Sequence, residues 1–130
     1  MASKKPTRLV VTTTPLNRQF VGNPVTINIE GDNHAPAPVA DRSVHVQVQV
    51  VHYRGGIPFV DLVPLAAQPT LNGPADNDTT SQVKFTASAI FTPRFLGTHV
   101  VKVTAWNNRT NEKPKDGKDN TRTQVTFRAG

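Results

Sequence analysis

The chain has 130 residues, a formal net charge of +6 and no cysteine, with 11 prolines and 8 glycines against one methionine. Its length predicts a single domain with one core, and the lack of cysteine excludes disulfides, thiolate metal sites and cysteine nucleophiles. Residues 1–20 contribute +4, residues 21–93 contribute −3 and residues 94–130 contribute +5, so both ends are basic.

Period-two alternation of apolar and polar residues, interrupted by Pro, Gly, Asn and Asp, predicts short strands throughout the chain. No window shows apolar residues at helical spacing without an interrupting Pro or Gly. The predicted strands are residues 7–14, 24–30, 43–53, 57–63, 82–92, 98–106 and 121–128. We expect Gly31–Asn33 to end the second strand, and the Pro-rich residues 34–42 to be a connector.

The third predicted strand has the strongest alternation, with valines at 44, 46, 48 and 50 on one face and polar residues on the other. Arg54-Gly55-Gly56 indicates a tight hairpin, and Pro58 marks the strand after it as an edge strand. Residues 64–80 are predicted to form a long polar loop.

The sixth predicted strand raises a question about the only tryptophan in the chain. If Val101, Val103 and Ala105 face the core, then Lys102 and Trp106 face outward. We expect Trp106 to be exposed, close to Tyr53. The alternative is that a bulge, or the end of the strand, turns the ring inward over the core.

The segment AIFTPRFLGTHVVKVTAWN, within residues 81–107, resembles the penultimate-strand region of immunoglobulin-like domains of the bacterial, phage and polycystic-kidney-disease-repeat type. His99 stands where those families carry a corner tyrosine. The resemblance implies a seven-stranded Ig-like antiparallel β-sandwich over residues 7–130, with a flexible basic N-terminal arm over residues 1–6.

The same resemblance implies that the third, sixth and seventh strands are adjacent in one sheet, and that the first strand lies near the last. The two basic ends of the chain would then come together. From this placement we expect a partner-binding surface made of Lys4, Lys5, Arg8, Tyr53, Lys102, Trp106, Arg122 and Arg128.

The sequence predicts no enzyme, because no nucleophile accompanies the histidines at 34, 45, 52 and 99, and His45 and His52 lie on opposite faces of one strand. We interpret these histidines as isolated surface or strand-end residues. The Asp and Asn residues of 75–80 and 116–120 suit turns better than calcium, so no metal or cofactor is predicted. No run reaches the length of a membrane span or a signal-peptide core, so we expect no membrane insertion.

Three functions fit these features. The first is an Ig-like accessory (decoration) protein on a phage capsid exterior, made in the host cytoplasm, that binds the shell and mediates adhesion to a host surface or glycan. The second is an extracellular adhesion or carbohydrate-binding domain of a secreted bacterial protein. The third is a nucleic-acid-binding coat or packaging protein, which the mixed charges of the last loop and the few aromatic residues disfavour.

Overall fold

In the computed structural model the protein is all-β, as predicted. The structure describes residues 8–15, 19–33, 44–65, 69, 83–107 and 120–130, and these contain seven strands and no helix. The strands are β1 (Arg8–Thr14), β2 (Val25–Asn33), β3 (Val44–Arg54), β4 (Ile57–Val63), β5 (Val83–Phe91), β6 (Gly97–Asn107) and β7 (Thr121–Ala129). The predicted N-terminal arm, the connector 34–42 and most of the two long loops lie outside the described residues.

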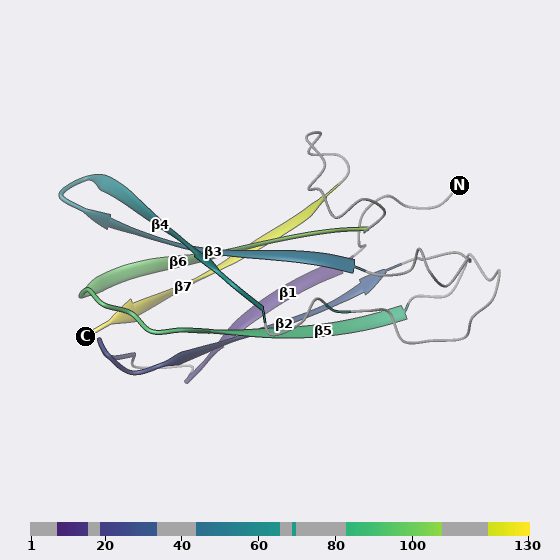
Figure 1. Cartoon of the computed structure of the whole chain (residues 1–130), viewed down its shortest axis with the longest axis horizontal. Coiled ribbons are helices and arrows are strands. Elements are labelled where there is room, and N and C mark those ends of the chain that lie inside the picture. The colour runs from purple at the N-terminus through teal and green to yellow at the C-terminus, as the bar shows by residue number, and fades with distance from the viewer. Residues whose placement is uncertain (1–7, 16–18, 34–43, 66–68, 70–82, 108–119) are drawn as a thin grey trace.

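The strands form two antiparallel sheets, one with the order β1-β2-β5 and the other with the order β4-β3-β6-β7 (Figure 1). The predicted adjacency of the third, sixth and seventh strands is therefore confirmed. The fourth strand pairs with the third and extends the larger sheet, where it forms an edge as Pro58 indicated.

The first strand lies against the last, as expected for this fold class. Beyond β1, Gln19 forms a parallel bridge with Ala129. The Gly130 N–H donates to the carbonyl oxygen of Gln19 at 2.8 Å. The two sheets are therefore joined along this side, and the free edges lie at β4 and β5.

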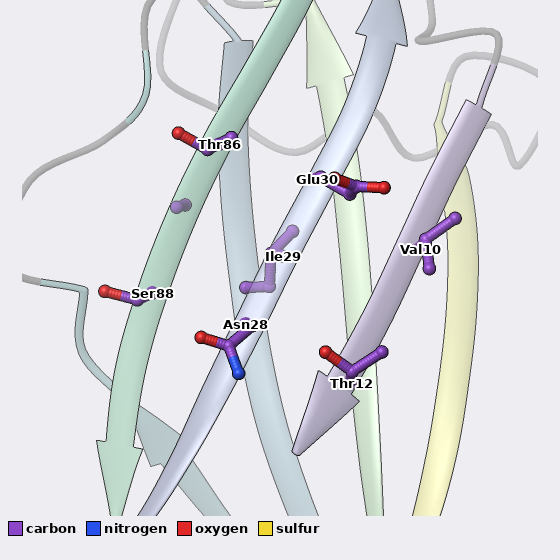
Figure 2. A pocket seen from close by; sticks show the side chains of 8 residues that line it. Val10, Thr12, Asn28, Ile29, Glu30, Thr86 and Ser88 are labelled. Carbon is purple, nitrogen blue, oxygen red and sulfur yellow. The ribbon is translucent and has the colours of Figure 1, made fainter. Parts of the chain in front are cut away.

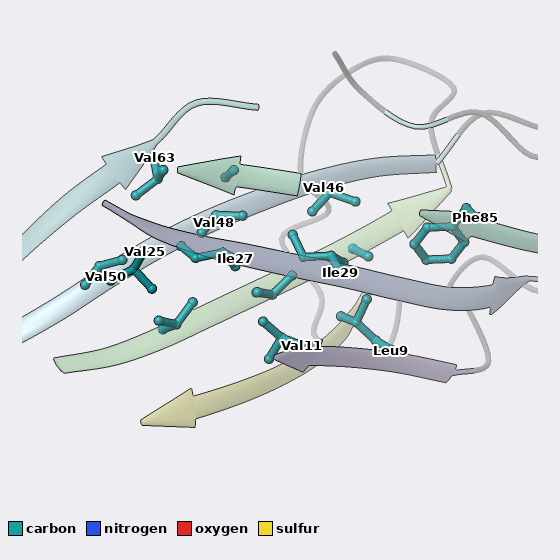
Figure 3. Packing of buried hydrophobic residues seen from close by; sticks show 14 of the residues in the cluster. Leu9, Val11, Val25, Ile27, Ile29, Val46, Val48, Val50, Val63 and Phe85 are labelled. Atoms are coloured by element: carbon teal, nitrogen blue, oxygen red, sulfur yellow. The ribbon is translucent and has the colours of Figure 1, made fainter. Parts of the chain in front are cut away.

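The core lies between the two sheets and is built from alternate residues of every strand (Figure 3). Val25, Ile27 and Ile29 of β2 face the valines of β3 at 46, 48 and 50. Val101, Val103 and Ala105 of β6 belong to the same core, which confirms the predicted phase of that strand. Because these side chains leave water together, their burial is the main force that holds the sheets face to face.

The second strand does not end where the sequence indicated. Gly31 and Asp32 continue β2, opposite Phe85 and Lys84 of β5. Gly31 is required here because a Cβ at this position would collide with the ring of Phe85 and with the Arg8 carbonyl. Asp32 also stays in the strand, where it lies opposite Arg8 and accepts a hydrogen bond from its Nε at 2.5 Å.

The predicted hairpin between β3 and β4 is confirmed. Gly55 and Gly56 have φ angles of 58° and 81°, the pair of positive values that a type I′ two-residue turn requires. This turn sets the register of β4 against β3, with Arg54 opposite Ile57 and Tyr53 opposite Pro58.

Candidate functional site

The outer face of the four-stranded sheet carries most of the residues that the sequence selected for binding. Lys102 lies between Gln49 and Gln124, and Thr104 lies between Gln47 and Arg122. Among the described residues of this face none is Asp or Glu, so its charge comes from Lys102, Arg122 and Arg128. We call this surface the basic face.

Trp106 lies on the outer phase, as predicted, but it is not exposed. It pairs with His45, it is outside the core group of side chains, and only 4 % of its surface is accessible. The centroids of the His45 and Trp106 rings are 5.0 Å apart. The prediction that Trp106 is exposed was wrong. The period-two alternation of a strand predicts the direction in which a side chain points, but it does not predict which other residues cover that side chain. The inward alternative also fails, since the register of β6 runs without a bulge to Asn107.

Tyr53 does not lie beside Trp106, which corrects the second part of that expectation. Trp106 pairs with His45 near the start of β3, whereas Tyr53 lies eight residues further along the same strand. At roughly 3.4 Å per residue this separates them by about 27 Å. Arg128 lies opposite Thr98 near the Tyr53 end, whereas Arg122 lies opposite Thr104 near the Trp106 end.

Arg8 belongs to the other sheet and is occupied by internal partners. Its guanidinium forms ion pairs with Asp32 at 2.5 Å and with Glu30 at 3.3 Å. The hydrogen bonds to these two carboxylates raise the pKa of Arg8, with the bond to Asp32 the larger cause. The structure therefore does not place Arg8 with the basic face, and Lys4 and Lys5 lie outside the described residues.

A hollow of about 460 Å³ opens on the basic face. Its polar side chains are Gln49, Lys102, Thr104, Arg122 and Gln124. The Nε of Arg122 donates to the Oδ1 of Asn120 at 3.1 Å, which orients the guanidinium. Two cations and two amides thus converge on one depression without a carboxylate of the described chain between them.

The sequence analysis missed an apolar surface on the β3–β4 hairpin, which projects at one end of the molecule (Figure 1). Five of its large apolar side chains are exposed: Tyr53, Ile57, Phe59, Val60 and Leu62. Tyr53, Val60 and Leu62 lie on the outer face of the hairpin, whereas Ile57 and Phe59 lie on its inner phase with His52. We call Tyr53, Val60 and Leu62 the hairpin patch. The sequence IPFVDLV could have indicated this surface. Its apolar residues occupy both faces of the strand, although Pro58 marks it as an edge strand.

The backbone of β4 adds to the hairpin patch. The two residues that flank a two-residue turn, here Arg54 and Ile57, form a hydrogen-bonded pair. Hydrogen-bonded and non-hydrogen-bonded pairs alternate along an antiparallel ladder, so the backbone N–H and C=O groups of residues 58, 60 and 62 point away from β3. Pro58 has no N–H to offer there, and Pro64 directly follows the strand. Val60 and Leu62 are therefore the residues of β4 whose N–H groups can pair with a further strand.

A row of four rings crosses the inner side of the same sheet: Phe59, His52, His99 and Phe127. Neighbouring ring centroids are 5.4, 5.2 and 4.9 Å apart, and each pair is stacked. Both histidines are buried. The interpretation of these two histidines as isolated surface or strand-end residues was wrong, because the register of β3 against β6, which the linear sequence does not show, places them opposite each other.

The surroundings of the histidines are largely apolar and aromatic. The Nδ1 of His99 lies 3.0 Å from the carbonyl oxygen of Gly97, a bond comparable to that of a corner tyrosine. Burial, the largest cause, lowers the pKa of His99, and it also lowers the pKa of His45. The described residues include no group of three or more His, Asp or Glu side chains that could share a metal ion.

The outer face of the three-stranded sheet carries a second hollow, of about 680 Å³, which we call the polar hollow (Figure 2). Short polar side chains from three strands surround it: Thr12 of β1, Asn28 and Glu30 of β2, and Thr86 and Ser88 of β5. It is uncharged apart from Glu30, which is paired with Arg8.

No protein-family model matches the chain, and no curated protein matches it in sequence. The described residues form no helix of the length and apolar character needed to cross a membrane.

Proposed function

We propose that the protein is a non-enzymatic recognition module that attaches to the surface of a larger protein assembly through the hairpin patch. Within that class we propose an Ig-like accessory protein on a phage capsid exterior. The carrying observation is the concentration of exposed apolar side chains on the hairpin, where Tyr53, Val60 and Leu62 are 61 %, 55 % and 65 % exposed. Contiguous apolar surface of this kind marks interaction sites in soluble proteins.

The charges around the hairpin patch favour an acidic or neutral partner over a second copy of this chain. The guanidinium of Arg54 lies 4.0 Å from the centroid of the Phe95 ring, and Arg128 lies opposite Thr98 at the same end of the sheet. Two copies that met at their patches would bring these arginines together, and the whole chain carries +6. Like charges placed across an interface disfavour association.

Apolar burial alone leaves little surplus for stable attachment. Full burial of Tyr53, Val60 and Leu62, which share one face, contributes at most roughly 1.5–3 kcal/mol each, and this total lies within the cost of association of about 4–15 kcal/mol. We therefore expect polar contacts to contribute as well. The N–H groups of Val60 and Leu62 offer a short stretch of strand pairing to a partner segment, which is a common mode of recognition at sheet edges.

Attachment of this kind is tested by co-sedimentation with purified phage capsids. We expect the wild-type chain to sediment with the capsids, and Val60→Ser/Leu62→Ser to remain in the supernatant. The matched control is Ile90→Ser/Leu96→Ser, which removes two apolar side chains of similar exposure elsewhere and is expected to sediment as wild type.

Two outcomes would overturn the proposal. Equal loss in both double variants would mean that the hairpin patch is not the attachment site. If no capsid carries the wild-type chain into the pellet, the assignment to a capsid exterior is wrong.

The alternative is an adhesion or carbohydrate-binding domain of a secreted bacterial protein, and the polar hollow favours it. Thr12, Asn28 and Ser88 lie side by side across three strands and offer hydroxyl and amide groups that suit sugar hydroxyls. Binding of neutral glycans that is lost in Asn28→Ala/Ser88→Ala, with capsid sedimentation absent, would favour this function instead.

A further inference from the structure

We propose that the basic face binds an acidic polysaccharide, whose carboxylate groups are held by Lys102 and Arg122 in the hollow between β3, β6 and β7. This inference is independent of the attachment proposed for the hairpin patch. It concerns a neighbouring part of the same outer face, where Leu62 of the hairpin patch lies opposite Gln49 of the hollow, and a different class of ligand.

The cations are placed as a pair. Lys102 lies opposite Gln124 on β7, and Arg122 lies two residues from Gln124 on the same strand, opposite Thr104. Diagonal neighbours of this kind are roughly 7–8 Å apart, a span that long side chains bridge readily. Both side chains border the same hollow of about 460 Å³. One carboxylate can therefore contact both cations, or two successive carboxylates can contact one each.

The guanidinium of Arg122 is oriented for this role. Its Nε donates to Asn120 Oδ1 at 3.1 Å, which uses one of the five donors of the group. Planar guanidinium donors match the geometry of a carboxylate, whereas the Lys102 ammonium acts as a compact charge beside it. No Asp or Glu lies among the described residues of this face, so these residues supply no carboxylate that competes with the ligand there.

The groups around the cations suit a sugar backbone. Gln49 and Gln124 lie on either side of Lys102, and Thr104 and Gln47 continue the next row. Each amide can both donate and accept, as sugar hydroxyls require. The cations of β6 and β7 and the amides of β3 and β7 thus provide contacts to both the charge and the hydroxyls of a uronic-acid polymer.

A nucleic acid is the less suitable polyanion for this face. Single-stranded nucleic acids gain much of their affinity from stacking of bases on exposed aromatic rings. Trp106 is buried against His45, and Tyr53 lies four residues further along β3 than Gln49, about 14 Å away at 3.4 Å per residue. No exposed aromatic ring of the described residues therefore lies between Lys102 and Arg122.

The full-length protein is titrated calorimetrically with a short oligoguluronate, with a neutral maltooligosaccharide and with single-stranded oligothymidylate. We expect the oligoguluronate to bind, the neutral sugar not to bind, and the oligothymidylate to bind more weakly. Lys102→Gln/Arg122→Gln should raise the Kd for oligoguluronate by at least about tenfold, since charge-assisted contacts are lost. Thermal unfolding verifies that this variant is folded.

The matched control is Lys84→Gln/Arg94→Gln, which removes the same charge from exposed positions elsewhere and should change the Kd less than about twofold. In the wild-type chain, ligand-induced NMR shifts should fall on the side-chain amides of Gln49 and Gln124. Equal weakening in both double variants, tighter binding of oligothymidylate, or no binding of oligoguluronate would each overturn the inference. Capsid sedimentation of Lys102→Gln/Arg122→Gln should remain as in wild type, so a failure here is distinguishable from failure of the hairpin attachment.

Discussion

His45 and Trp106 lie directly opposite each other on β3 and β6, and their ring centroids are 5.0 Å apart on the face of the sheet that points away from the core. The contact places the single tryptophan in a buried position, 4 % exposed, outside the main core. Trp106 therefore contributes to the stability of this end of the sheet, and it is not part of the surfaces that we propose for binding.

We expect Trp106→Ala to lower the free energy of unfolding by about 3–5 kcal/mol, the usual cost of truncating a buried large aromatic side chain. Urea denaturation measures the change. Tyr53→Ala is the control, and because Tyr53 is exposed its effect should stay within about 0.5 kcal/mol. Equal effects in the two variants would contradict the burial of Trp106. Since the chain has one tryptophan, its fluorescence gives a second check, and emission should be blue-shifted and poorly quenched by acrylamide.

The stability of the protein should decrease in mild acid because of His99. Burial lowers the pKa of His99 in the folded state below its unfolded value of about 6.5. Above that pH both states are neutral at this site, and below it the unfolded state binds more protons, so the free energy of unfolding falls as pH drops.

Urea denaturation at several pH values from about 8 to about 5 measures this dependence. In His99→Phe we expect a smaller decrease, because the stacking on Phe127 is retained and the titrating group is gone. Part of the decrease in stability should persist in this variant, because burial also lowers the pKa of His45. The charge of Asp61 acts on His99 and raises its pKa against the larger effect of burial, and Arg94 lies 3.6 Å from Asp61. Both residues are unchanged in this variant. An identical pH dependence in wild type and His99→Phe would contradict the assignment.

Gly31→Ala should destabilise the sandwich by about 1–3 kcal/mol through overpacking. The added methyl group would collide with the ring of Phe85, which is buried, and with the carbonyl oxygen of Arg8. A double-mutant cycle with Phe85→Leu tests the cause, because a smaller side chain should relieve part of the cost of Gly31→Ala. Additive effects would show that the destabilisation does not come from this contact.

The burial of the core is tested by the same substitution, Ile to Val, at one buried and one exposed position. Ile27→Val should lower the free energy of unfolding by about 0.5–1.5 kcal/mol, since Ile27 is fully buried between the sheets. Ile90→Val removes the same methylene from an exposed side chain on the neighbouring strand and should have almost no effect. A comparable loss at position 90 would mean that this outer face is covered.

The candidate surfaces were only partly predictable. Lys102 and Arg122 were found because period two places them on one face and the fold class places β6 beside β7. The hairpin patch was missed, because IPFVDLV is apolar at both phases and a pattern cannot tell a covered strand from an exposed edge. Arg8 was misassigned, because its partners Asp32 and Glu30 come from a neighbouring strand whose register had to be known.

Local patterns in the sequence were enough to predict seven strands, their inward and outward faces and the tight turn at Gly55-Gly56, since each of these depends on residues close together in the chain. The end of β2 was the exception, because Gly31 and Asp32 continue that strand. Only the tertiary structure decided that His52 and His99 stack in one row, that Gly31 accommodates Phe85, and that Trp106 is covered while Tyr53 is exposed. The physical reason is that side-chain alternation defines a direction from the backbone, whereas exposure and pairing depend on which distant strand lies alongside and in which register.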